Sequence, residues 1–336
     1  MNLPRDPKHF VVDQNVLRRE QHLRPVVEEA RRRGELVVLP DIALAEMMKH
    51  PSGWEGTLGQ SLQILARDPD LVAIAQCSGE LLRREHATGQ PCTDIIDDEV
   101  TREVRVLLRE LPAGGPTLAR IRTTISNAQR LGQHQHFDNA RNRTLLQDLV
   151  AAWRSDLRPE DIRALRQPVS REATMRRLLS ERSTTVACAT ALRGGSFNED
   201  DALMLAVQPS ASAHNFLVIV ALALNWLAYD GLATASGDKL TNDLADMEYV
   251  FLATFCRSLT TLETKVQEMD ARMRAVIAER ARDLDGVVAQ ILVSNEERVR
   301  VAAYFRWLAR GKQDGAALDD WLEAERELNV NGQTAA

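Results

Sequence analysis

Short apolar runs alternate with amphipathic stretches at the start of this 336-residue chain. Residues 8–13, with the apolar run Phe10-Val11-Val12, and Leu36 to Leu39 have the pattern of strands; apolar runs without polar alternation are typical of strands buried on both faces of a parallel sheet. Between them, Val16 to Arg33 have the apolar spacing of a helix, and Gly34 ends that stretch. We therefore predict a strand, a helix and a second strand, followed by a helix that Asp41 caps.

The middle of the chain, residues 55–235, consists of long amphipathic stretches separated by Pro and Gly breaks. This pattern predicts a large all-helical insertion. Its longest apolar stretch, Phe216 to Ala228, contains Asn225 and is too short to span a bilayer, so we expect a buried helix and no membrane contact. The apolar pattern of an α/β fold then resumes, and we expect a strand near Arg257 to Thr260.

These patterns predict an α/β fold in which a parallel sheet lies between helices. Residues 1–54 and 236–275 would form one split α/β domain around the helical insertion at 55–235. Residues 276–330 would form C-terminal helices that end in a helical hairpin.

Acidic residues follow the apolar runs at both ends of the chain. Strands that end in a carboxylate bring acids from distant sequence to the carboxyl edge of a parallel sheet, where open α/β folds place their sites. Clustered carboxylates repel one another unless a divalent cation neutralises them, and oxygen ligands suit Mg²⁺ or Mn²⁺. Five acids are candidates: Asp13, Glu46, Asp243, Asp246 and Glu263.

The order of these motifs resembles the PIN-domain nucleases over roughly residues 8–50 and 235–275. The resemblance implies metal-dependent hydrolysis of RNA, with Asp13, Glu46, Asp243 and Glu263 as metal ligands and Asp246 as a further catalytic acid. It rests on Val11-Val12-Asp13-Gln14-Asn15-Val16-Leu17, on Glu46, on Asn242-Asp243-Leu244-Ala245-Asp246-Met247-Glu248-Tyr249, and on Thr261-Leu262-Glu263.

Positive charge is concentrated in one part of a chain whose net charge is −6. Residues 116–183 contain 13 Arg, no Lys and 7 acidic residues, and guanidinium binds phosphate in a bidentate manner. We expect this segment to contact nucleic acid; a solvated helix face is the alternative reading. The candidate contacts are Asn15, Arg141, Arg143, Arg176 and Arg177.

The function that these features predict is an Mg²⁺- or Mn²⁺-dependent endoribonuclease that cleaves single-stranded RNA. A toxin with an antitoxin partner, a defence effector and an RNA-processing enzyme are its alternative roles, and a homo-oligomer is compatible with each. One rival is an inactive PIN-like scaffold that binds RNA or protein, and another is a purely helical interaction protein. The four cysteines lie far apart without metal-ligand spacing, which favours reduced thiols in the cytoplasm.

The C-terminal residues resemble a small bacterial domain of unknown function. Gly311 would end one helix and Asp319 would cap the next, so that Trp307 and Trp321 pack together in a helical hairpin. The resemblance rests on Ala303-Tyr304, Trp307, Gly311, Asp314-Gly315 and Asp320-Trp321-Leu322.

Overall fold

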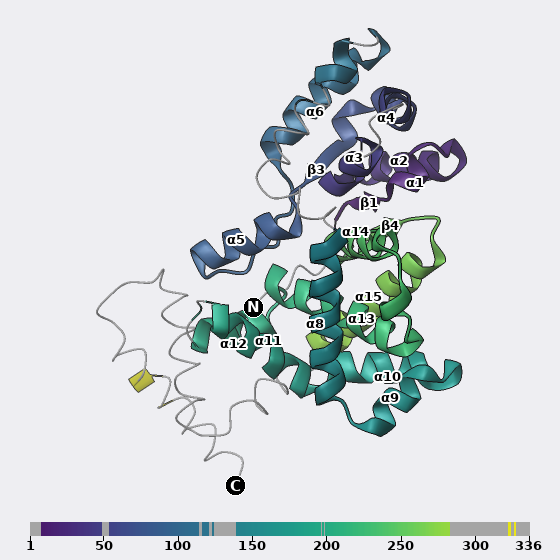
Figure 1. Cartoon of the computed structure of the whole chain (residues 1–336). Coiled ribbons are helices and arrows are strands. Elements are labelled where there is room, and N and C mark those ends of the chain that lie inside the picture. Colours follow the sequence, from purple (N-terminus) through teal and green to yellow (C-terminus); the bar gives the residue numbers. More distant parts are fainter. Residues whose placement is uncertain are drawn as a thin grey trace.

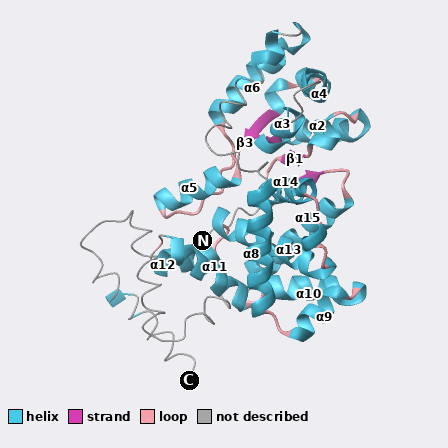
Figure 2. Cartoon of the chain, viewed as in Figure 1, coloured by secondary structure: helices cyan, strands magenta, loops and turns pink. Residues whose placement is uncertain are grey.

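A computed structural model describes residues 8–48, 54–113, 116–120, 123, 139–195, 197, 199–282, 322–323 and 326. Helices dominate this part of the chain, with a small parallel sheet in the upper half of the view in Figure 2. The chain is therefore an α/β protein with large helical parts. The predicted C-terminal hairpin lies almost entirely outside the described residues.

The sheet contains four parallel strands within the described residues, in the order β3-β2-β1-β4. Val11 lies opposite Val38 of β2 and Leu259 of β4, so the N-terminal strand is the link between the two halves of the sheet. The strands are β1 (Phe10–Val12), β2 (Val37–Pro40), β3 (Val72–Ala75) and β4 (Ser258–Thr260).

Helices cover both faces of the sheet, because successive strand side chains point to opposite sides. Val11 and Val38 belong to the apolar cluster that contains α13 (Ala211–Tyr229), α14 (Gly237–Ala253) and α15 (Thr264–Arg282). Val12, Val37 and Leu39 belong to a second cluster, on the other face. Its helices are α1 (Gln14–Leu17), α2 (Glu20–Arg33), α3 (Asp41–Met48), α4 (Trp54–Leu62) and α6 (Asp98–Glu110).

Six further helices pack against α13, and most of them lie below α14 in Figure 1, whereas α5 lies to the left of α14. They are α5 (Ser78–Thr88), α8 (Asn139–Asp156), α9 (Pro159–Arg166), α10 (Pro168–Ser180), α11 (Arg182–Gly195) and α12 (Glu199–Val207). Helix α13 is long and apolar enough to cross a membrane by length and composition, but 78% of its most apolar window is buried inside the protein. The prediction of a buried helix at Phe216 to Ala228 is confirmed.

Three predicted features differ from the structure. Strand β3 lies within residues 55–235, which we predicted to be all-helical; its four residues between tight turns are too few to show a period. The predicted helix from Val16 to Arg33 is two helices, α1 and α2, which break at Arg18 and Arg19. Helix α15 runs across residue 275, where we predicted a domain boundary.

Candidate functional site

The carboxyl ends of β1 and β4 lie side by side. Val12 pairs with Thr260, and the backbone N–H of Asp13 donates to the Thr260 carbonyl at 3.0 Å. The chain leaves β1 toward β2 on one side, whereas β4 joins on the other, so the strand order reverses between β1 and β4. Ligands of open α/β sheets bind at such a reversal, outside the carboxyl ends of the strands.

Asp13 is the buried centre of this edge. Its side chain is 4% exposed, and its Oδ2 accepts hydrogen bonds from Asn15 Nδ2 and Thr261 Oγ1, both at 2.6 Å. Asn15 Nδ2 also lies 3.4 Å from Glu263 Oε1, and Asn15 Oδ1 accepts from the backbone N–H of Leu262 at 3.1 Å. Asn15 therefore joins the first predicted acid to the last one.

Helix α14 contributes two acids that share a lysine. Lys265 Nζ contacts Asp243 Oδ1 and lies 3.2 Å from Asp246 Oδ2. The Asp243 side chain is only 8% exposed, and Lys239 on its own helix lies 3.6 Å from its other oxygen. Burial opposes the charge of Lys265, but the hydrogen bond and charge of Asp243 raise the pKa of its ammonium.

Glu46 approaches the same region from α3. Its Oε2 accepts a hydrogen bond from the Tyr249 hydroxyl of α14 at 2.7 Å. Burial and the negative charges of Glu46 and Asp13 raise the pKa of Tyr249 well above its usual value, so the phenol stays protonated. Tyr249 thus lies within the electrostatic influence of both Asp13 and Glu46.

Electrostatic interactions connect the predicted acids. Burial raises the pKa of Asp13, and the charge of Glu263 adds to the shift although the Thr261 hydrogen bond opposes it. Burial also raises the pKa of Asp246 to about 6; Lys265 opposes this shift, while Glu263 and Asp243 add to it. Glu263 therefore interacts with acids of both β1 and α14, and the site carries surplus negative charge.

Carboxylate and amide oxygens are donors that suit Mg²⁺ or Mn²⁺. As the side chains stand, however, no group of three or more Asp, Glu, His or Cys in the described ranges is arranged to hold a metal ion. Asp243 and Asp246 contact the Lys265 ammonium instead. The donor chemistry thus fits a hard divalent ion, and its binding requires Lys265 to move away from the two aspartates.

Three residues of this edge were not assigned roles from the sequence: Tyr249, Thr261 and Lys265. Tyr249 and Thr261 both belong to the motifs quoted above, so a hydrogen bond from each to a neighbouring acid could have been predicted from those motifs. Lys265 contacts α14 across a turn and a strand, and nothing in its local sequence indicates that pairing.

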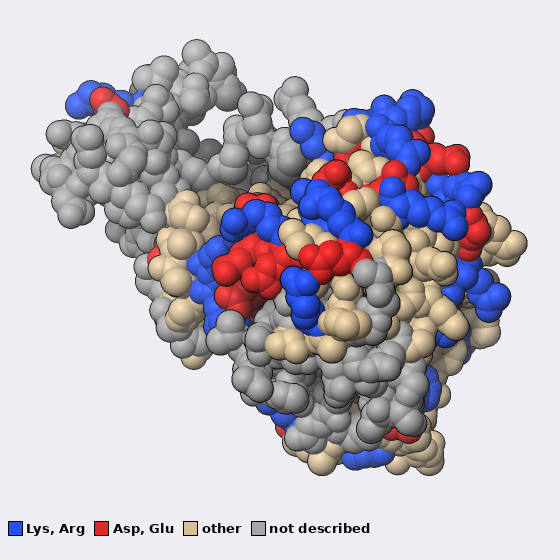
Figure 3. All heavy atoms as spheres, turned by 90° about the horizontal axis from the view of Figure 1, so that it is seen from above, with Lys and Arg blue, Asp and Glu red and all other residues tan. Residues whose placement is uncertain are grey.

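The predicted nucleic-acid arginines lie on helices α8 and α10 of the helical body, and Arg176 lines a cavity to which Asp243 also contributes. Arg143 donates to the Ala235 carbonyl at 2.6 Å, and Arg141 is exposed on α8. Arg176 and Arg177 of α10 form ion pairs with Glu279 and with Asp161 and Glu181. In the view from above, acidic side chains gather in one patch with basic side chains around it (Figure 3). Phosphate binding by these arginines stays a prediction.

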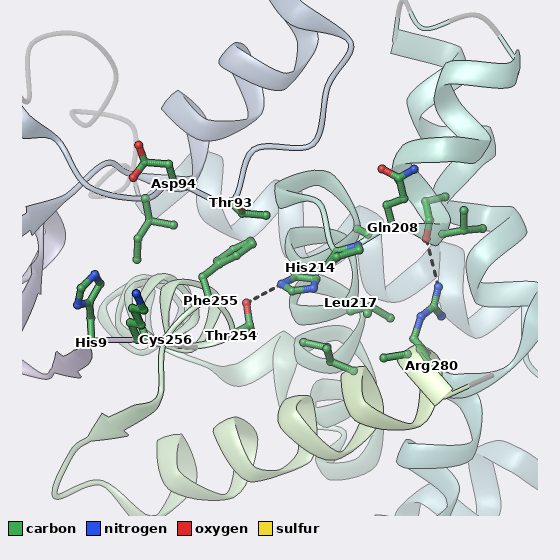
Figure 4. Close-up of a pocket in the computed structure, with 18 of the residues that line it drawn as sticks. His9, Thr93, Asp94, Gln208, His214, Leu217, Thr254, Phe255, Cys256 and Arg280 are labelled. Carbon is green, nitrogen blue, oxygen red and sulfur yellow. Dashed lines mark hydrogen bonds between the residues drawn. The ribbon is translucent and has the colours of Figure 1, made fainter. Parts of the chain in front are cut away.

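A cavity of about 540 Å³ lies elsewhere, with none of the predicted acids in its lining (Figure 4). Its His214 is buried, stacks on Phe255 and lies 2.8 Å from Thr254 Oγ1 through Nδ1. Burial lowers the pKa of His214 to about 3, so the imidazole is neutral. Arg280 donates to the carbonyls of Leu179 and Ala206 at helix C-terminal ends, where cations are favoured. These contacts account for the buried guanidinium as a structural group.

Comparison with known families finds one match. Residues 294–329 match the model of a protein family of unknown function, DUF2934. This match confirms the expected C-terminal module of unknown function, but it covers a small part of the chain. No curated protein and no solved structure matches the chain. The resemblance to PIN-domain nucleases stays a prediction.

Proposed function

We propose that this protein is a PIN-like nuclease that hydrolyses phosphodiester bonds of single-stranded RNA with Mg²⁺ or Mn²⁺. One observation carries the proposal. Asn15 links Asp13 to Glu263, which is 250 positions away in sequence, where the strand order reverses between β1 and β4. Asp246 interacts electrostatically with Glu263, and Tyr249 interacts with both Asp13 and Glu46.

The residues have distinct roles in this proposal. Asp13, Glu46, Asp243 and Glu263 would hold the ion, and Asp246 would orient the attacking water. When bound, the ion supplies an activated water at neutral pH and neutralises charge on the phosphate. Asn15 and Thr261 would orient the Asp13 carboxylate, and Tyr249 would orient Glu46, while the ion replaces Lys265 at Asp243.

Arg141, Arg143, Arg176 and Arg177 would contact the RNA backbone. We place this activity in the cytoplasm, where the four cysteines, free in the structure, stay reduced. The roles that fit this chemistry are a toxin bound by a protein antitoxin, a defence effector and an RNA-processing enzyme.

An inactive PIN-like scaffold is the second candidate, and Lys265 is the observation that favours it. Its ammonium already contacts both Asp243 and Asp246 and offsets part of their negative charge, which a divalent ion would otherwise do. In this case the sheet edge would be a fixed ion-pair network and the chain would bind RNA or protein without cleaving it.

Cleavage of an end-labelled single-stranded RNA by the full chain separates the two candidates. With Mn²⁺ present, Asp13→Asn should reduce the cleavage rate by at least about a hundredfold, because it removes a charged ligand and its geometry. Asp148→Asn, an exposed acid of α8, is the matched control and should cleave like the wild type. Wild-type protein that cleaves no RNA with Mg²⁺ or Mn²⁺ would contradict the nuclease and favour the scaffold.

A further inference from the structure

A large cavity begins beside the candidate site and extends into the helical body. Its volume is about 1180 Å³, and α10, α13, α14 and α15 contribute to its walls. Asp243 and Lys265 line it, so the cavity reaches the candidate site at Asp243. Pockets of roughly 300–1,000 Å³ hold drug-sized ligands, so this cavity has room for more than one nucleotide.

Positive charge predominates in the lining. Five cationic side chains face three acidic ones there, and most of the cations already contact an acid. Arg171 differs: its guanidinium donates to the carbonyls of Leu165 and Arg166 and to the Tyr229 hydroxyl. Within the described ranges, no carboxylate forms an ion pair with Arg171. A phosphate would supply the missing negative charge.

Two aromatic rings lie in the same wall, on α13. Tyr229 is 66% exposed, and the Arg171 guanidinium lies 4.3 Å from its ring centroid. Trp226 lies under Lys239 at 5.0 Å and is 6% exposed. Its buried indole N–H has no hydrogen-bond partner among the residues that the structure describes, although Trp226 also borders a smaller cavity against α8. A base or ribose oxygen would satisfy this donor.

We propose that this cavity binds the nucleotides that flank the cleaved phosphate in a single-stranded nucleic acid. A base stacks on Tyr229 and is bordered by Trp226, and a backbone phosphate binds Arg171. Stacking on aromatic rings beside cations is the common way in which proteins hold single strands. The assignment of the strand's path toward Asp243 rests on the proposed nuclease function; the binding site itself does not.

Binding without cleavage tests this inference. The probes are fluorescein-labelled 12-nucleotide oligo(U) and oligo(dT), measured by anisotropy with the full chain in EDTA at several salt concentrations. Tyr229→Ala should weaken binding about 5- to 150-fold, the range found for losing one stacked base. Tyr229→Phe keeps the ring and removes only the hydroxyl that Arg171 contacts, so it should weaken binding much less than Tyr229→Ala. Comparison of the two probes shows whether the strand is RNA or DNA.

Arg171→Gln should weaken binding and flatten the log–log salt dependence by about 0.7, which is the effect of one lost phosphate contact with a single strand. Arg163→Gln, an exposed arginine of α9 outside the cavity lining, is the matched control and should change neither quantity. Circular dichroism of each variant shows that the helices are retained.

The outcomes separate this inference from the nuclease proposal. If the wild type binds neither probe, or if Tyr229→Ala and Arg171→Gln bind like the wild type, the cavity is not the binding site, whatever the cleavage assay gives. If these variants bind weakly but the wild type does not cleave RNA, the inference stands and the nuclease proposal fails. Asp148→Asn, an exposed acid of α8 outside the cavity lining, should bind both probes like the wild type.

Discussion

Asp13 has its carboxylate held by residues from both ends of the chain. Asn15 follows it by two positions, whereas Thr261 comes from the turn after β4. These hydrogen bonds stabilise the ionised carboxylate, but burial is the larger effect and raises its pKa. A buried acid with a raised pKa beside other acids costs folding free energy at neutral pH, which is common where residues are positioned for a ligand rather than for stability.

Asp246 is a second buried acid with a raised pKa, and its effect on the free energy of unfolding can be measured. Its pKa of about 6 in the folded state lies above the ordinary 3.8, so the folded state binds the proton more tightly than the unfolded state. The stabilisation is complete below about pH 4 and is lost as the pH rises through about 6. The shift corresponds to at most about 3 kcal/mol.

Asp246→Asn should remove this part of the pH dependence. We expect urea unfolding of the wild type to lose stability between pH 4 and 7 relative to the variant, so the difference in unfolding free energy between the two proteins should change with pH in that window. A difference that stays constant from pH 4 to 7 would show that Asp246 titrates normally in the folded protein.

At the scale of elements, the sequence predicted the parts whose signals are local. Residues 8–13, Leu36 to Leu39 and Arg257 to Thr260 contain β1, β2 and β4 almost to the residue, because apolar runs between turns are a local signal. β3 was missed because a short apolar run such as Val72 to Ala75 cannot be distinguished by its period from part of a buried helix, and helical spacing surrounds it in the sequence. The apolar runs that predicted β1 and β4 also placed Asp13 and Glu263 after the ends of these strands. The ion pairs of Lys265 with Asp243 and Asp246 could not be predicted in this way.

Helix α13 shows how a distant residue fixes an element. Glu85 of α5 is fully buried and accepts hydrogen bonds from the backbone N–H groups of Ala211 and Ser212, at 2.6 and 2.8 Å. It also accepts from the Ser212 hydroxyl and from the backbone N–H of Cys92, both at 2.6 Å. An acid at a helix N-terminus satisfies unpaired N–H groups and interacts well with the helix dipole.

Replacing Glu85 should therefore destabilise the helical body. We expect Glu85→Ala to lower the unfolding free energy by about 3 kcal/mol or more, because several buried donors lose a charged acceptor at once. Glu80→Ala, on the same helix in an exposed pair with Arg83, should cost less than about 1 kcal/mol. Equal stabilities of the two variants in chemical denaturation would show that Glu85 does not hold α13.

At the scale of the whole molecule, the candidate site brings together residues that lie up to 250 positions apart in sequence. Asp13 directly follows β1, Glu46 belongs to α3, Asp243 and Asp246 belong to α14, and Glu263 lies in the turn after β4. The helical body contacts this site through α14. The large cavity that Asp243 and Lys265 line also extends from the site into the helical body. A ligand that gathers these acids therefore stabilises contacts across the entire fold.

This arrangement predicts that Mn²⁺ stabilises the folded protein. A ligand that binds only the folded state adds about 2.7 kcal/mol at a hundredfold excess over its dissociation constant, so the melting temperature of the wild type should rise with Mn²⁺ concentration.

Lys265→Met should melt below the wild type in EDTA, because Asp243 and Asp246 lose their counter-charge, and should gain more from Mn²⁺, because no ammonium competes. Asp13→Asn should lose most of the Mn²⁺ response, and Arg163→Gln should keep it. Calorimetry that finds no Mn²⁺ response in either the wild type or Lys265→Met would mean that the lysine is a permanent partner of the two aspartates and that the sheet edge is a scaffold without a metal.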